Sequence, residues 1–191
     1  MTDEPTGGES VSAVRTLLRE IGEDPDRPGL AGTPERVRRM YAELTSGYRT
    51  DPDTLVNGAC YQVDYDEMVV VRDIEFYSLC EHHLLPFFGR VSVGYLPRGT
   101  VIGLSKIPRI VELYAKRLQI QERLTTEIAA FLMERLEPKG VGCVVEANHL
   151  CTMMRGVKKE QARMVTSAML GTFRRDGRTR NEFLRLIGRS D

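Results

Sequence analysis

Residues 67–83 read Glu-Met-Val-Val-Val-Arg-Asp-Ile-Glu-Phe-Tyr-Ser-Leu-Cys-Glu-His-His, and this stretch decides the fold. Its β-branched first part predicts a strand over 67–76 that runs directly into a loop at Cys80. Residues 88–96 alternate between apolar and other residues and predict the hairpin partner of that strand. The two strands therefore place a Cys/His motif at the end of a hairpin.

Two further strands are predicted C-terminal to the hairpin. Residues 140–151 form a β-branched run, and a last strand falls within 162–173. Apolar residues at helical spacing predict helices over 107–118 and 122–136, and a short helix over 181–187 closes the chain. This order favours an α+β fold with a four-stranded antiparallel sheet and helices packed on one face.

The N-terminal part of the chain precedes all strand-like sequence. Amphipathic patterns that begin at Ser10 and at Thr33 predict two helices, which form an N-terminal helical appendage. The predicted organisation is a disordered N-terminus over 1–9, the appendage and its connector over 10–58, and a catalytic domain over 59–191.

Composition narrows the class of protein. Of the 191 residues, 41% are hydrophobic, which is enough for one full core, and 27 basic residues balance 27 acidic ones. A net charge of zero gives no field that attracts nucleic acid, and no apolar run is long enough to cross a membrane, so neither is an expected partner. The acidic, polar start at residues 1–5 lacks the features of a signal peptide, which predicts a cytoplasmic protein with reduced thiols. A small sheet exposes two edges, and closure by further copies of the chain predicts a homo-oligomer.

All three histidines of the chain lie within three residues of a cysteine. Thiolates and neutral imidazoles together select Zn²⁺ among divalent metals, and one turn of backbone closes a Cys-x-x-His motif around a single ion. Residues 149 and 151, two apart on the strand predicted over 140–151, are expected to project from one face and to complete the site. The candidate ligands are Cys80, His82, His83, His149 and Cys151.

Five candidates exceed the four ligands that zinc usually takes. In a Cys-x-x-His loop the first and fourth residues can point together while the third points away, which assigns the metal to Cys80, His83 and Cys151. A fourth position is then open to water, with His82 and His149 beside it, and an open position indicates catalysis.

The alternative is a closed Cys₂His₂ zinc staple in an interaction module, with the spare histidine idle. A thiol–disulfide role for Cys80 and Cys151 has less support, because the chain has no Cys-x-x-Cys motif. The other two cysteines, Cys60 and Cys143, are predicted to be buried small hydrophobic residues without a chemical role.

Cations begin the helix that Ser105 is expected to cap. Lys106 and Arg109 in the first turn are unfavourable there unless an anion compensates, because a helix N-terminus is already positive and offers free N–H groups. The pattern predicts a phosphate site, and Arg155, four residues beyond the last candidate ligand, can complete a clamp on the same anion. Glu122 alone is an ordinary first-turn acid. If it lines the pocket, its two oxygens can accept the ring N–H and the exocyclic amino group of guanine.

Taken together, these motifs resemble the GTP cyclohydrolase I family. The resemblance spans roughly residues 30–191 and rests on Thr-Pro-Glu-Arg-Val at 33–37, Cys-Glu-His-His at 80–83, Ile-Gly-Leu-Ser-Lys at 102–106, Gln-Glu-Arg-Leu-Thr at 121–125, His-Leu-Cys at 149–151, Met-Arg-Gly at 154–156 and Glu-Phe-Leu at 182–184. It implies a tunnelling-fold (T-fold) subunit and a homodecamer of two face-to-face pentamers with sites at subunit interfaces.

The resemblance also implies a role for each candidate residue. It implies zinc ligation by Cys80, His83 and Cys151, and acid–base catalysis by His82 and His149. It implies contacts to a triphosphate from Lys106, Arg109 and Arg155, contacts to guanine from Gln121 and Glu122, and a part in later proton transfers for Ser105.

The reaction implied by the resemblance converts GTP and water to 7,8-dihydroneopterin triphosphate and formate, the first step of tetrahydrofolate and pterin biosynthesis. Zinc-bound water attacks C8 of the purine, a histidine delivers a proton to N7, C8 leaves as formate, and the remainder recloses into a pterin. The implied cofactor is Zn²⁺ and the substrate is GTP. A rival T-fold enzyme, a nitrile reductase of the queuosine route, would use a cysteine nucleophile and a nicotinamide site, and the paired histidines argue against it.

Overall fold

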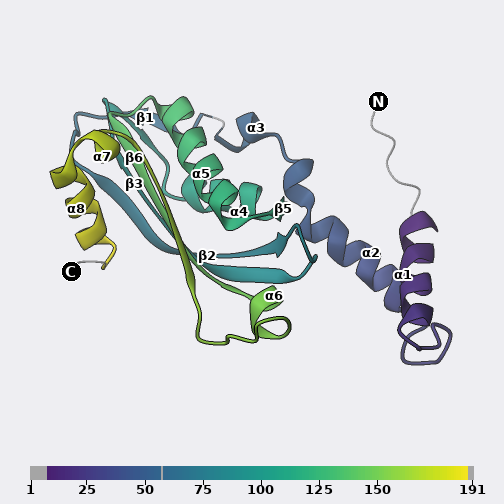
Figure 1. Ribbon diagram of the computed structural model, residues 1–191. Coiled ribbons are helices and arrows are strands. Elements are labelled where there is room, and N and C mark those ends of the chain that lie inside the picture. The colour runs from purple at the N-terminus through teal and green to yellow at the C-terminus, as the bar shows by residue number, and fades with distance from the viewer. Residues whose placement is uncertain (1–7, 57, 189–191) are drawn as a thin grey trace. The chain divides into compact units, whose positions relative to one another are not determined.

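A computed structural model describes residues 8–56 and 58–188 (Figure 1). The chain divides into two compact units, Met1–Ser46 and Gly47–Asp191. Of the predicted disordered segment, residues 1–7 lie outside the described residues, and residues 8 and 9 are helical. No described helix combines the length and the apolar character that crossing a bilayer requires.

The first unit is a pair of helices, α1 (Gly8–Glu20) and α2 (Thr33–Leu44), which pack on each other. Pro34 lies in the first turn of α2, where its missing N–H and fixed φ suit a helix start. An ion pair of 2.6 Å between Arg15 and Asp26 ties α1 to the loop that links the helices. Both helices that the sequence predicts in this region are present.

The second unit is built on a sheet with strand order β5-β2-β3-β6-β7. Its four long strands are antiparallel and match the predicted ones within a few residues: β2 (Val69–Cys80), β3 (Pro86–Leu96), β6 (Gly140–His149) and β7 (Met164–Gly171). Leu79 pairs with Pro86 and Phe87 pairs with His149, so β2 and β6 finish at the same end of the sheet. This register brings the two halves of the Cys/His sequence together.

The sheet has five strands rather than the predicted four, because β5 (Leu118–Gln119) pairs in parallel with β2. A separate antiparallel pair joins β1 (Cys60–Gln62) to β4 (Thr100–Ile102). Strands of two or three residues are too short to leave a periodic signal in the sequence. Cys60, predicted to be buried, is exposed on β1. Two short helical segments, η1 (Ser46–Tyr48) and α3 (Pro52–Val56), precede β1.

Two helices, α4 (Lys106–Ala115) and α5 (Gln121–Leu136), cover one face of the sheet (Figure 1). The core between helices and sheet is made of fully buried side chains, among them Val91, Val93, Ile107, Ile110, Leu124, Ile128, Leu132, Val141, Cys143 and Val145. Cys143 is fully buried in this core, as predicted, and burial raises the pKa of its thiol to about 12.

Two further helices, α7 (Thr172–Arg175) and α8 (Gly177–Leu186), pack against the opposite face, so the prediction of helices on one face only is wrong. Phe173 and Phe183 form a second small core there with Val144. Glycines make room for the rings, because a Cβ at Gly94 or Gly142 would lie 2.6 Å from a ring carbon.

Replacing Phe183 with alanine is expected to lower the free energy of unfolding by about 3–5 kcal/mol. The ring is fully buried and meets Phe173 edge-on with 5.5 Å between centroids, so its loss leaves a cavity over the sheet. Urea denaturation measures the change. Leu186→Ala on the same helix, where the side chain is 46% exposed, is the control and should cost about 1 kcal/mol or less. Equal losses in the two variants would show that burial of the Phe183 ring is not what stabilises this face of the sheet.

Candidate metal centre

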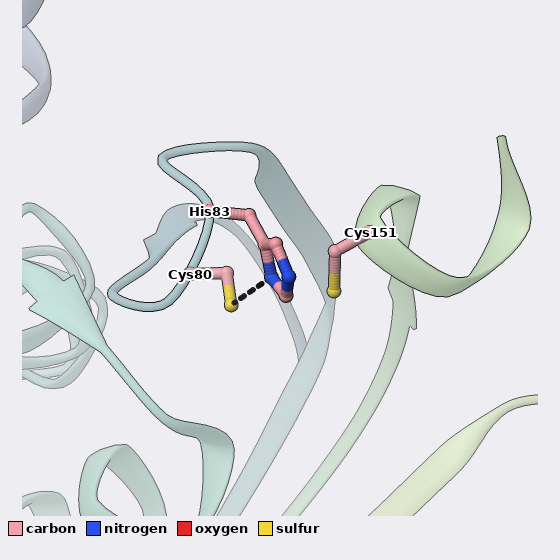
Figure 2. Close-up of side chains that lie close together, drawn as sticks. All are labelled: Cys80, His83 and Cys151. Carbon is pink, nitrogen blue, oxygen red and sulfur yellow. Dashed lines mark hydrogen bonds between the residues drawn. The ribbon is translucent and has the colours of Figure 1, made fainter. Parts of the chain in front are cut away.

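Three of the five candidate ligands converge at one end of the sheet (Figure 2). Cys80 is the last residue of β2, His83 lies in the turn that follows, and Cys151 lies in α6 (Leu150–Met153). One ligand atom from each side chain lies within 4.8 Å of the other two. Within the described residues, no other three Cys, His, Asp or Glu side chains are grouped in this way.

The turn after β2 brings the first and fourth residues of the Cys-x-x-His motif together. The N–H groups of His83 and Leu84 both donate to the carbonyl oxygen of Cys80, at 3.3 and 2.9 Å, and the N–H of Cys80 donates to the carbonyl of Leu85 at 2.9 Å. Leu84 closes the turn with a φ of 53°. As a result, Nδ1 of His83 lies 3.9 Å from the Cys80 sulfur, as the dashed line in Figure 2 marks.

Cys151 reaches the centre by a different route from the one predicted. The expectation that residues 149 and 151 share one strand face is wrong, because β6 ends at His149 and α6 begins at Leu150. A helical turn, closed by the Met154 N–H donating to Leu150 at 3.1 Å, brings Cys151 to the other two ligands. His149 instead stays in register with Phe87 on the neighbouring strand.

The two thiols of the centre are buried and lie close together. Cys80 is 6% exposed and Cys151 is 8% exposed. Burial, followed by the neighbouring Cys80, raises the pKa of the Cys151 thiol, so this thiol does not readily ionise without a compensating cation. A divalent ion supplies that charge, and two thiolates with one imidazole are a donor set that suits Zn²⁺. The residues present therefore fit a metal.

Arg155 is placed directly at the centre, where its guanidinium lies 3.1 Å from Nε2 of His83. A guanidinium only donates hydrogen bonds, so Nε2 is the acceptor nitrogen of His83 in this arrangement. If a metal is held through Nδ1, the ring proton must sit on Nε2. Ligation through Nδ1 and the Arg155 contact therefore exclude each other.

His82 lies beside the centre but outside the three-residue group. Its Nδ1 is 3.9 Å from the Cys80 sulfur, and its ring is 6.3 Å from that of His83. Its Nε2 lies 3.9 Å from the carboxylate of Glu81, which is paired in turn with Arg123 on α5. Sequence reasoning did not single out Glu81 or Arg123, because their contact joins residues 42 positions apart.

His149 occupies a half-buried position next to β3. Its ring stacks on Phe87 with 4.7 Å between centroids and 3° between planes, and its Nε2 lies 2.8 Å from Oε1 of Gln121. Burial lowers the pKa of His149, and the negative charge of Glu122 partly opposes this effect. The imidazole is therefore neutral near pH 7. Glu122 is exposed, whereas Gln121 is buried.

The predicted phosphate residues lie at the start of α4. Ser105 is the N-cap residue and is exposed, but its side chain makes no capping hydrogen bond. Lys106 is half-buried and Arg109 is exposed. Across residues 8–56 and 58–188, no side-chain hydrogen bond or ion pair connects these three residues with the Cys/His group. Of the predicted phosphate contacts, only Arg155 touches the centre.

The chain was compared with protein families, with individual proteins and with solved structures. Residues 10–188 match the family model described as GTP cyclohydrolase I. The chain is 58% identical to GTP cyclohydrolase 1 of Synechococcus sp. strain JA-3-3Ab over 96% of this chain and 82% of that protein. It is 56% identical to GTP cyclohydrolase 1 of Leptospira biflexa over 91% and 95%, respectively. Among solved structures, an archaeosine synthase described as QueF-Like matches 55% of this chain and 93% of its own, with 21% identity and a TM-score of 0.44.

Proposed function

The chain belongs to the GTP cyclohydrolase I family, and from this premise we propose that it converts GTP and water to 7,8-dihydroneopterin triphosphate and formate. One observation of the structure supports the proposal most strongly. Cys80, His83 and Cys151 converge, while His82 lies next to Cys80 and His149 bonds to Gln121 instead of joining the group. Three ligands leave room for water on a four-coordinate ion, and two further imidazoles are available to move protons.

We infer that the ion is Zn²⁺, held by Cys80, His83 and Cys151. When bound, it would supply a water molecule whose pKa is lowered to about 7 in favourable sites. Two thiolates neutralise the charge of such an ion and weaken this effect, so the nearby bases carry more of the proton transfer. For His83 to bind through Nδ1, Arg155 must leave Nε2, which frees a guanidinium for the substrate.

His82 and His149 are assigned to proton transfer. Addition of water to C8 of the purine removes one proton from the water and requires one at N7. His149 is kept neutral by burial, which suits it to accept the proton from water. His82 is exposed beside Glu81, and delivery of the proton to N7 is assigned to it. Ring opening then releases C8 as formate, and Ser105 is assigned to the proton transfers of the later reclosure.

The remaining site residues are assigned to holding the substrate. A triphosphate carries several negative charges, and Lys106, Arg109 and Arg155 are the cations proposed to bind it. The first two lie at the N-terminus of α4, where backbone N–H groups and the helix dipole add to the attraction. A fixed triphosphate keeps the substrate in place while the bonds of its base and ribose are remade. Glu122 is assigned to guanine.

We also infer a T-fold catalytic domain over 59–191, a helical appendage with its connector over 10–58, and assembly into a homodecamer in the cytoplasm. The exposed outer strand supports closure by further copies, because Val165 on β7 is 49% exposed and an unpaired edge favours strand addition. Size-exclusion chromatography with light scattering measures the assembly directly.

Glu122→Gln is expected to lower kcat/KM for GTP roughly 10- to 100-fold, since a hydrogen-bonded pair with a charged group is worth about 1.5–3 kcal/mol. In the proposed complex the Glu122 carboxylate accepts hydrogen bonds from N–H groups of guanine. The glutamine amide would instead direct an N–H donor of its own toward one of them. For inosine triphosphate, which lacks the exocyclic amino group, the same substitution should lower kcat/KM less. Glu134→Gln, an exposed change on the same helix, is the control. Unchanged discrimination against ATP in Glu122→Gln would remove Glu122 from the reading of guanine.

The proposed activity is tested by incubating the purified protein with GTP while formate and pterin fluorescence are followed. Both should form together, and a chelator should stop both. A zinc staple in an interaction module would give neither product, and its chelation would unfold the protein. Reduction of a nitrile at the expense of a nicotinamide would support the rival enzyme.

A further inference from the structure

Gln121 is the first residue of α5, and its side chain is enclosed by protein on all sides with 1% exposed. Its Nε2 lies 3.1 Å from the carbonyl oxygen of Val145 on β6 and 3.0 Å from that of Met164 on β7. Its Oε1 lies 2.8 Å from Nε2 of His149. Both polar atoms of this side chain therefore have hydrogen-bond partners within the protein.

The backbone carbonyls decide which way the Gln121 amide points. A carbonyl oxygen only accepts hydrogen bonds, so the group that faces Val145 and Met164 must be the NH₂. The group that faces His149 must then be the amide oxygen, which also only accepts. It follows that Nε2 of His149 carries a hydrogen and donates it to Gln121. In the neutral ring, Nδ1 is then the nitrogen with the lone pair.

We propose that Gln121 is a positioning residue that fixes His149 as the tautomer with hydrogen on Nε2 and a lone pair on Nδ1. The proposal rests on the use of His149 for proton transfer in the proposed function, and it replaces the expected contact between Gln121 and guanine. A histidine that works as a base needs one defined nitrogen free, and a fixed hydrogen bond to the other nitrogen provides it.

Neighbouring threonines hold the Gln121 amide in place. Nε2 also lies 3.1 Å from Oγ1 of Thr166, and that hydroxyl lies 2.6 Å from Oγ1 of Thr125. Thr125, one turn further along α5, donates to the backbone carbonyl of Gln121 at 2.6 Å. The amide is therefore bound to β6, β7 and its own helix, and it cannot rotate without breaking several buried hydrogen bonds.

The plane of the His149 ring is fixed separately. Phe87 stacks on it at 3° between planes, so the ring keeps one orientation while Gln121 binds one of its nitrogens. Nδ1 is thus the only ring atom of His149 that can take a proton from a reacting group. The proton exchanged with the substrate is assigned to Nδ1.

The tautomer can be read without any substrate. The chain has only three histidines, so ¹⁵N NMR of histidine-labelled, zinc-loaded protein gives three pairs of ring-nitrogen signals, assigned by single substitutions. For His149 we expect a protonated Nε2 and an unprotonated Nδ1. A protonated Nδ1 with an unprotonated Nε2 would overturn the proposal, whether or not the protein turns over GTP.

Gln121→Met is expected to lower kcat for formate release about 10- to 100-fold, the range for losing a residue that orients a functional group, with KM for GTP unchanged. In the NMR spectrum the two His149 tautomers should then exchange. Gln119→Met is the matched control, because Gln119 is also 1% exposed but bonds to Tyr114 and Glu127 instead. Gln119→Met should leave the ring-nitrogen signals of His149 and the kcat for formate release unchanged.

Gln121→Glu separates positioning from packing, because it keeps an oxygen to accept from His149. It should retain hydrogen on Nε2 and recover part of the kcat that Gln121→Met loses. The proposal would be contradicted if Gln121→Met raised KM for GTP and lost discrimination against inosine triphosphate while the His149 signals stayed unchanged. Gln121 would then be a guanine contact.

Discussion

Replacing Cys151 with alanine is expected to remove bound zinc from the protein and to abolish formate release from GTP. The substitution deletes one of two thiolate ligands from a group whose donor atoms lie within 4.8 Å of one another. Metal affinity should fall by more than the roughly 100-fold that loss of a residue supporting a ligand can cost, because a ligand itself is lost. Elemental analysis of the dialysed protein and a formate assay on the same sample measure both effects.

Cys143→Ala is the matched control for this substitution. Cys143 is also a buried cysteine of the same strand-to-helix segment, but its side chain lies in the core under α5, and it belongs to no group of possible metal ligands among the described residues. It should keep zinc and activity at a modest cost in stability. Full zinc content in Cys151→Ala, or equal losses in the two variants, would contradict the assigned centre.

His149→Ala should keep zinc but lower kcat by about 10²- to 10⁴-fold, the range that general acid–base catalysis contributes. The reason is that His149 bonds to Gln121 and stacks on Phe87 rather than joining the three converging side chains. Zinc content, kcat and thermal unfolding are measured together, because the lost ring also leaves space beside Phe87.

His83→Ala serves as the comparison. This variant should lose both zinc and activity, whereas His149→Ala should lose activity alone. Loss of zinc from His149→Ala would make His149 a fourth ligand. The site would then be closed, which favours the zinc staple over the enzyme.

Local patterns predicted much of this structure. Alternation and β-branched runs placed the four long strands, and apolar spacing placed α4 and α5 within three residues of their observed ends. The Cys-x-x-His spacing correctly predicted that Cys80 and His83 come together, because one turn of backbone decides their geometry, whereas Cys151 joins them through α6. Features set within a few residues of chain are thus open to sequence reasoning.

Features set by tertiary contacts were missed or wrong. The packing of Phe183 of α8 on the second face depends on Gly94 of β3 and Gly142 of β6. The β-branched run over 140–151 hid the helical turn that separates His149 from Cys151. The hydrogen bonds of the Gln121 amide to Val145, Met164 and Thr166 on β6 and β7 were not foreseen either. Each case joins residues far apart in sequence, where periodicity gives no signal.

The most direct test is a zinc titration of metal-free protein, with bound metal and the rate of formate release from GTP measured on each sample. The account predicts that formate release is absent without metal, rises in proportion to bound zinc, and reaches its maximum at one zinc per chain. Formate release at the full rate from metal-free protein, or none from protein that holds one zinc per chain, would contradict it.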